Sequence, residues 1–144
     1  MIIRHASVDD AKKIIKITDQ SRMTAGSREG LVDYPALSER DYAFRISDNQ
    51  FFYVAVRDDV IGFLAAYDDL DIARLSDDEI AVYIAKKPAP FVYLDVIAVE
   101  PEMRRHGIAS AMLQQLLSDT KEKGYPMIWG AVAHVPESKA GKNE

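Results

Sequence analysis

The residues best suited to chemistry lie between positions 99 and 110. They read Val99-Glu-Pro-Glu-Met-Arg104-Arg-His-Gly107-Ile-Ala109-Ser110. An apolar, strand-like segment ends in an acidic turn here, and a long amphipathic pattern typical of a helix follows at once. This arrangement predicts a row of backbone N–H groups and two cationic side chains at a helix start. Such a place can hold a diphosphate.

Other phosphate-binding patterns are absent from this stretch. No Gly-Lys-Ser/Thr of a Walker A loop occurs in the chain, and no Gly-x-Gly-x-x-Gly follows its first strand-like segment. What remains is a strand, then Arg104-x-x-Gly107-x-Ala109, then a helix. Gly107 lacks a Cβ where a phosphate must approach the backbone, and the N–H groups of residues 105–110 can donate to its oxygens.

The elements around this stretch predict a mixed α/β fold. Apolar alternation and helical spacing place them in the order strand, helix, helix, strand, strand, helix, strand, helix, strand. Their expected ranges are 2–6, 11–19, 36–46, 51–56, 60–67, 76–85, 91–99, 107–123 and 127–133, with a loop over 20–33. A strand at 80–84 stays an alternative to the short helix. The last three elements imply a right-handed crossover, so the sheet is antiparallel first and parallel later.

Composition narrows the class of protein. The 144 residues predict a single domain over 1–135, followed by a polar tail over 136–144. A net charge of −5 without a basic stripe argues against nucleic-acid binding. The chain has no cysteine, and its three histidines lack metal-ligand spacing, so no metal is expected. With neither a signal peptide nor a membrane-spanning run, we expect no membrane partner and a cytoplasmic protein.

The central stretch resembles the GNAT superfamily of acyl-CoA-dependent N-acetyltransferases. The signature of that family is Gln/Arg-x-x-Gly-x-Gly/Ala after its fourth strand, and Arg104-Arg-His-Gly-Ile-Ala109 fits every fixed position. The resemblance extends from Ile3 to about Val135. It implies a twisted, largely antiparallel sheet flanked by helices, with an acetyl-CoA-binding βαβ unit at 91–133. The alternative is a βα turn that serves packing alone.

The resemblance also implies which residues contact acetyl-CoA. The backbone of the fourth strand should pair with the pantetheine arm, and the amides of 105–110 should hold the diphosphate. For His106, a side chain that merely faces solvent is the alternative. The implied set is Ile97, Ala98, Val99, Arg104, Arg105, His106, Gly107, Ile108, Ala109 and Ser110.

Catalysis by that family is direct attack of an amine on the thioester, often with a general base on the fourth strand. Alternation predicts Tyr93, Asp95, Ile97 and Val99 on one face of this strand. Asp95 is therefore the candidate base, and pairing with a nearby cation is the equal alternative. The resemblance implies the N–H of Val99 as the contact for the oxyanion. Glu100 is assigned to the turn.

The acceptor is expected to be a small-molecule amine or a protein amino group. Tyr34, Tyr42 and Tyr67 are candidates for lining its pocket. The family pattern continues after the fifth strand with a helix that often carries a thiolate-protonating Tyr, yet no Tyr follows Tyr125. A fragment, a truncated gene and a short family member stay open, and so does a homodimer that covers the last strand. A catalytically weak acyl-CoA-binding or regulatory module is the alternative function.

Overall fold

The computed structural model describes residues 1–23, 36–75 and 79–130. The strands are β1 (Ile2–His5), β2 (Phe52–Arg57), β3 (Asp59–Asp68), β4 (Val92–Val99) and β5 (Ile128–Gly130). The α-helices are α1 (Ala11–Met23), α2 (Glu39–Ile46), α3 (Asp69–Ile72), α4 (Glu79–Ile84) and α5 (Ile108–Glu122). Two short 3-10 turns are η1 (Val8–Asp10) and η2 (Pro101–Met103). No helix in this described part of the chain combines the length and apolar character needed to cross a bilayer.

The strands form one sheet in the order β1-β2-β3-β4-β5. The first three pairings are antiparallel, and β4 pairs with β5 in parallel. The parallel pair needs a crossover, and α5 supplies it. The hairpin of β2 and β3 turns at Asp58, whose φ is 67°. This topology confirms the predicted mixed sheet, antiparallel first and parallel later.

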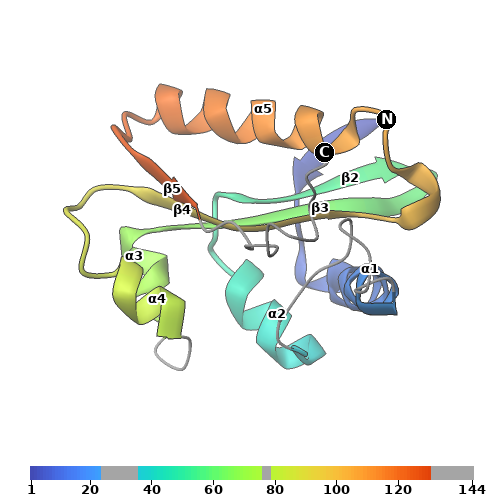
Figure 1. The fold of residues 1–144 in the computed structure, drawn as a ribbon, viewed down its shortest axis with the longest axis horizontal. Helices are drawn as coiled ribbons and strands as arrows, with labels where there is room; N and C mark the ends of the chain where they lie inside the picture. Colours follow the sequence, from blue (N-terminus) through green and yellow to red (C-terminus); the bar gives the residue numbers. More distant parts are fainter. Residues whose placement is uncertain (24–35, 76–78, 131–144) are drawn as a thin grey trace, which may run out of the picture.

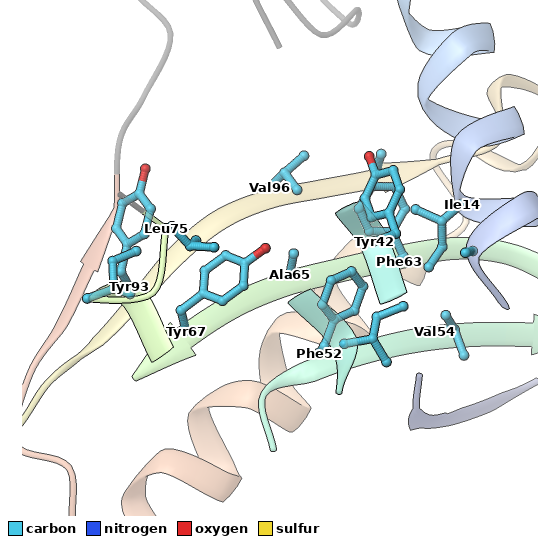
Figure 2. Packing of buried hydrophobic residues seen from close by; sticks show 14 of the residues in the cluster. Ile14, Tyr42, Phe52, Val54, Phe63, Ala65, Tyr67, Leu75, Tyr93 and Val96 are labelled. Carbon is cyan, nitrogen blue, oxygen red and sulfur yellow. The ribbon is translucent and has the colours of Figure 1, made fainter. Parts of the chain in front are cut away.

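Helices cover both faces of the sheet, as Figure 1 shows: α5 lies on one face and α1 to α4 on the other. Each layer has its own apolar cluster. Ile14, Tyr42, Phe63 and Tyr67 belong to the cluster under α1 to α4, part of which Figure 2 shows. Ile108, Met112 and Leu116 of α5 lie in the opposite cluster. The sheet is therefore buried on both sides, which explains the almost continuous apolar pattern of β3 and β4.

The approach of α5 to the sheet depends on Gly62 of β3. A Cβ at this position would lie 3.1 Å from the carbonyl oxygen of Ala98 and 3.3 Å from Cε of Met112. The first of these atoms belongs to the backbone and cannot move aside easily. Glycine at this position therefore lets the helix and β4 approach β3 closely.

The junction between β1 and α1 is held by a carboxylate. Asp10 accepts 2.9 and 3.0 Å hydrogen bonds from the Arg4 guanidinium and a 2.8 Å bond from the Ser7 N–H. Burial would raise the pKa of Asp10, but these hydrogen bonds outweigh it and hold the pKa below its usual value. The predicted N-cap at Ser7 is confirmed, although it opens η1 rather than α1 directly.

The structure departs from the predicted elements at two places, and some of the predicted ranges lie outside the described residues. Residues 20–23 were expected in a loop, but they continue α1. The short helix α3 was not predicted, and Asp68 caps it by accepting a 2.7 Å hydrogen bond from the Asp71 N–H. The expected helix at 76–85 is present as α4, which rules out the alternative strand. The expected strand at 131–133 and the tail at 136–144 lie outside the described residues.

Candidate acetyl-CoA site

The loop between β4 and α5 makes two left-handed backbone steps. After η2, Arg105 has a φ of 66° and Gly107 has a φ of 79°. Gly107 is the N-cap of α5, and its carbonyl oxygen accepts the first helical hydrogen bond, from the Ala111 N–H, at 3.0 Å. A side chain at this φ would be strained, so glycine is favoured here. The loop thereby connects the end of β4 at Val99 to the start of α5 at Ile108.

A pocket of about 380 Å³ lies at this helix start. Its walls come from the end of β4, from the loop and from the first turn of α5. Among the described residues, no atom outside the two that adjoin Gly107 lies within 4 Å of where its Cβ would be. The first N–H groups of a helix have no intrahelical acceptor, so those of Ile108 to Ser110 are directed to this end of the helix. The lining residues are Val99, Met103, Arg104, Arg105, Gly107, Ile108, Ala109 and Ser110.

Two of the predicted site residues also brace the loop. Nε of Arg104 donates to the carbonyl oxygen of Val99, and its second guanidinium nitrogen donates to Oγ of Ser21 in α1, each at 3.2 Å. Nδ1 of His106 lies 3.0 Å from the carbonyl oxygen of Met103 and 2.8 Å from that of Arg104. Because both neighbours accept, the proton belongs on Nδ1. His106 is exposed and is not part of the pocket lining.

Within the described residues, the ladder between β4 and β5 covers the first part of β4. The described ladder joins Val92, Tyr93 and Leu94 to Ile128, Trp129 and Gly130. Farther along, the Glu100 N–H donates to the carbonyl oxygen of Ile61 at 2.9 Å, toward β3. Alternate residues of a ladder face alternate sides, so Ile97 and Val99 direct their N–H groups to the edge away from β3. Ala98 instead pairs with Phe63 of β3.

A β-bulge in β4 overturns one prediction about this strand. Val96 pairs with Ala65 and Leu94 with Ala66, so Asp95 is an extra residue between them. The alternation therefore shifts by one at this point. Tyr93, Val96 and Ala98 lie in the cluster under α1 to α4, whereas Leu94, Ile97 and Val99 lie in the α5 cluster. The predicted common face for Tyr93, Asp95, Ile97 and Val99 is wrong.

Asp95 faces the α1 to α4 side, where it meets a cation from α2. Its Oδ2 lies 3.6 Å from the nearest guanidinium nitrogen of Arg45. The same nitrogen donates a 3.3 Å hydrogen bond to the hydroxyl of Tyr67. Burial and the negative charge of Asp95 both raise the pKa of Tyr67, so this phenol stays protonated. Pairing with a nearby cation, the alternative drawn from the sequence for Asp95, is what the structure shows.

The candidate tyrosines of the acceptor pocket lie on this side too. Tyr42 and Tyr67 are each 1% exposed. Figure 2 shows both on the same side of the sheet as Tyr93. Tyr34, the third candidate, lies outside the described residues.

A comparison with models of protein families shows which family the chain belongs to. The model of the acetyltransferase (GNAT) family matches residues 17–139. The chain belongs to the GNAT family. The matched range contains the β4-loop-α5 unit and Arg45, so the pocket and the buried ion pair both belong to the GNAT domain.

Solved structures share the GNAT architecture at low sequence identity. A mutant of the BH1408 protein from Bacillus halodurans is 16% identical with a TM-score of 0.68, and the match covers 97% of this chain and 87% of that one. A ribosomal-protein-alanine N-acetyltransferase from Brucella melitensis is 19% identical with a TM-score of 0.60, over 97% and 86% of the chains. The aminoglycoside N-acetyltransferase AAC(6′)-Iy, solved in complex with CoA, is 17% identical with a TM-score of 0.59, over 96% and 80%. No curated protein sequence matches the chain.

Three residues of this GNAT site were not predicted from the sequence: Ser21, Arg45 and Met103. Ser21 and Arg104 are 83 positions apart, and no local pattern joins them. Arg45 did leave a signal, because it follows the buried Tyr42 by three positions and precedes the buried Ile46. That spacing places a cation beside the apolar face of a helix.

Among the described residues there is no group of three or more side chains suited to a metal ion.

Proposed function

We propose that the protein is an acetyl-CoA-dependent N-acetyltransferase that acts on a primary amine of a small molecule or of a protein. The observation that carries this proposal is the pocket at the start of α5, which adjoins the end of β4. The proposal agrees with membership of the GNAT family.

The residues of the pocket fit a diphosphate group. The N–H groups of Ile108, Ala109 and Ser110 and the positive end of the α5 dipole favour an anion there. Arg105 lines the pocket and adds a positive charge. The open space beside Gly107 lets a phosphate come close to the backbone. Arg104 also lines the pocket, and its hydrogen bonds to Val99 and Ser21 tie the end of β4 to α1.

The edge of β4 beyond its described pairing with β5 fits the arm that joins the diphosphate to the thioester. N–H groups of Ile97 and Val99 on this edge can pair with amide groups of the pantetheine, in the manner of an added strand. When bound, acetyl-CoA supplies an acetyl thioester whose C–S bond breaks as the C–N bond to the amine forms. An N–H group of this edge that the pantetheine leaves unpaired is proposed to donate to the carbonyl oxygen, where negative charge develops.

Asp95 is the proposed acceptor for the proton that the attacking ammonium must lose. It lies two positions before Ile97, and the bulge directs it to the face opposite α5. The proton passes to the carboxylate directly or through a water molecule, which leaves the nitrogen lone pair free to attack. The departing thiolate takes its proton from solvent.

Calorimetry with CoA tests the pocket, and the two ends of α5 offer matched variants. Gly107 and Gly124 have φ values of 79° and 82°, and neither has a non-adjoining atom within 4 Å of a built Cβ. Gly107→Glu and Gly124→Glu therefore carry a similar backbone strain. We expect Gly107→Glu to weaken CoA binding by about tenfold or more, because a carboxylate repels the diphosphate, and Gly124→Glu to leave it unchanged. Equal loss in both variants contradicts the pocket assignment.

Release of free thiol from acetyl-CoA over a panel of primary amines tests the transferase activity. Release that depends on one of the amines, with the acetylated amine found by mass spectrometry, supports the proposal. Tight CoA binding without thiol release from any amine supports the acyl-CoA-binding module instead.

A further inference from the structure

The Arg45–Asp95 pair is nearly excluded from solvent. The Arg45 side chain is 10% exposed and the Asp95 side chain 14%. Burying a guanidinium and a carboxylate costs a large desolvation free energy, which their attraction offsets only in part. An apolar pair at these positions would pack between α2 and β4 without that cost. The pair therefore calls for a reason other than stability.

Arg45 also contacts the neighbour of Asp95 on the next strand. Its guanidinium carbon lies 5.8 Å from the centroid of the Tyr67 ring, and its nitrogen donates to the Tyr67 hydroxyl. Tyr67 is almost completely buried. These contacts restrict where the guanidinium can lie, and so they restrict the cation that faces the β4 bulge.

We propose that Arg45 is a positioning residue that holds the Asp95 carboxylate ionised and oriented at the β4 bulge. This inference rests on the proposed function, because it assigns to Arg45 control over the group that receives the proton of the acceptor. A cation beside a carboxylate favours its charged form. Asp95 is then ready to accept a proton at lower pH than it would be without Arg45.

The groups that face Asp95 from the surrounding elements support this assignment. The pKa of Tyr67 in β3 responds to Asp95 and to Arg45 and Tyr42 of α2, so these groups lie close together. Arg74 and Asp71 line one small hollow together with Arg45 and Tyr67. Nη1 of Arg74 bonds to Oδ1 of Asp71, and Nη2 bonds to the carbonyl oxygen of Phe44, each at 3.3 Å. Arg45 thus pairs directly with Asp95, and Arg74 serves other partners.

The test is the pH profile of kcat/KM for amine-dependent thiol release in the wild type and in Arg45→Gln, Arg45→Lys and Arg74→Gln. Removing the cation makes Asp95 hold its proton to higher pH. We therefore expect the low-pH fall in kcat/KM, the acid limb of the profile, to lie about one pH unit or more higher in Arg45→Gln than in the wild type. Arg45→Lys should restore most of that shift. Arg74→Gln should keep the wild-type limb. Ionisation of the amine itself is the same in every variant and cancels in the comparison.

A second measurement covers variants that do not fold and a wild type that shows no activity. The Asp95 carboxyl carbon is titrated by NMR in ¹³C-labelled protein and is assigned by its absence in Asp95→Asn. With Arg45 in control, the Asp95 signal titrates at lower pH in the wild type and in Arg45→Lys than in Arg45→Gln or, where that variant does not fold, in Arg45→Met.

Three results would overturn the inference. They are an unshifted acid limb in folded Arg45→Gln, an equal shift in Arg74→Gln, and an Asp95 signal that titrates at the same pH with and without the cation at position 45. Failure of the proposed function looks different, because there the wild type releases no thiol from acetyl-CoA with any amine. The NMR titration then decides whether Arg45 controls Asp95.

Discussion

At the scale of single residues, Asp10 shows how one carboxylate holds a junction. Arg4 and the Ser7 N–H keep its pKa below the usual value despite burial. The folded-state pKa is therefore below the unfolded one, which is about 3.9. The ionised group stabilises the fold above about pH 4, and this stabilisation is lost as the pH falls through the folded-state pKa.

We expect Asp10→Asn to lower the free energy of unfolding by about 1 kcal/mol at pH 7. The estimate is modest because the Arg4 side chain is 43% exposed, which screens the ion pair. Urea unfolding at pH 7 and at pH 3 measures the effect. The adjacent, exposed Asp9 gives the control, and Asp9→Asn should change stability by less than about 0.5 kcal/mol. A difference between Asp10→Asn and wild type that is as large at pH 3 as at pH 7 would contradict the assignment.

At the scale of elements, α5 joins the site to the core. Its N-terminus forms the pocket, and its apolar face carries Met112 and Leu116, both 0% exposed. Leu117, the next residue, is 43% exposed. The same helix therefore offers a buried and an exposed leucine that differ by one position and share the same helix propensity.

Leu116→Ala should lower the free energy of unfolding by about 3 kcal/mol, because it removes buried methyl groups and leaves a cavity under the helix. Leu117→Ala should cost less than about 1 kcal/mol, since its side chain is largely in water. Chemical unfolding of the two variants beside the wild type measures both values. Similar losses in the two would mean that α5 packs on the sheet through a different face.

At the scale of the whole molecule, the proposed CoA site bridges elements that are distant in the chain. The pocket takes residues from β4, the loop and α5, and Arg104 links it to α1. Ligand binding to the folded state alone raises its stability, by about 2.7 kcal/mol at a free concentration of 100 times Kd. CoA should therefore raise the thermal midpoint of the entire domain.

Hydrogen exchange should locate the same effect along the chain. We expect CoA to slow exchange at the β4 edge, at Ile97 and Val99, and in the first turn of α5, at Ile108 to Ser110, because these N–H groups gain acceptors. The amides that pair β1 with β2 are the internal control, since they lie at the opposite edge of the sheet. Protection confined to the β1–β2 pair, or a midpoint that does not respond to CoA, would exclude this site.

Much of the fold was predictable because it depends on patterns that are local. The strands from β2 to β4 have almost continuous apolar runs, and α5 has helical spacing ended by Gly124, so their types and order follow from the sequence. The exact ends were less predictable. Helix α1 extends past Asp19 to Met23, although residues 20–23 are largely polar, and α3 is a single turn capped by Asp68.

The sequence by itself determined the loop between β4 and α5, because every part of that loop is contiguous. A strand end, the spacing Arg104-x-x-Gly107-x-Ala109 and a helix start follow one another within Val99 to Ser110, whereas the left-handed backbone at Arg105 was not predicted. Only the tertiary structure decided the face and the partner of Asp95. Its face depends on a bulge that arises from how β4 pairs with β3, and its cation comes from α2, fifty positions earlier. Strand register and contacts between distant elements form only when the sheet and its helices pack together, so no local pattern records them.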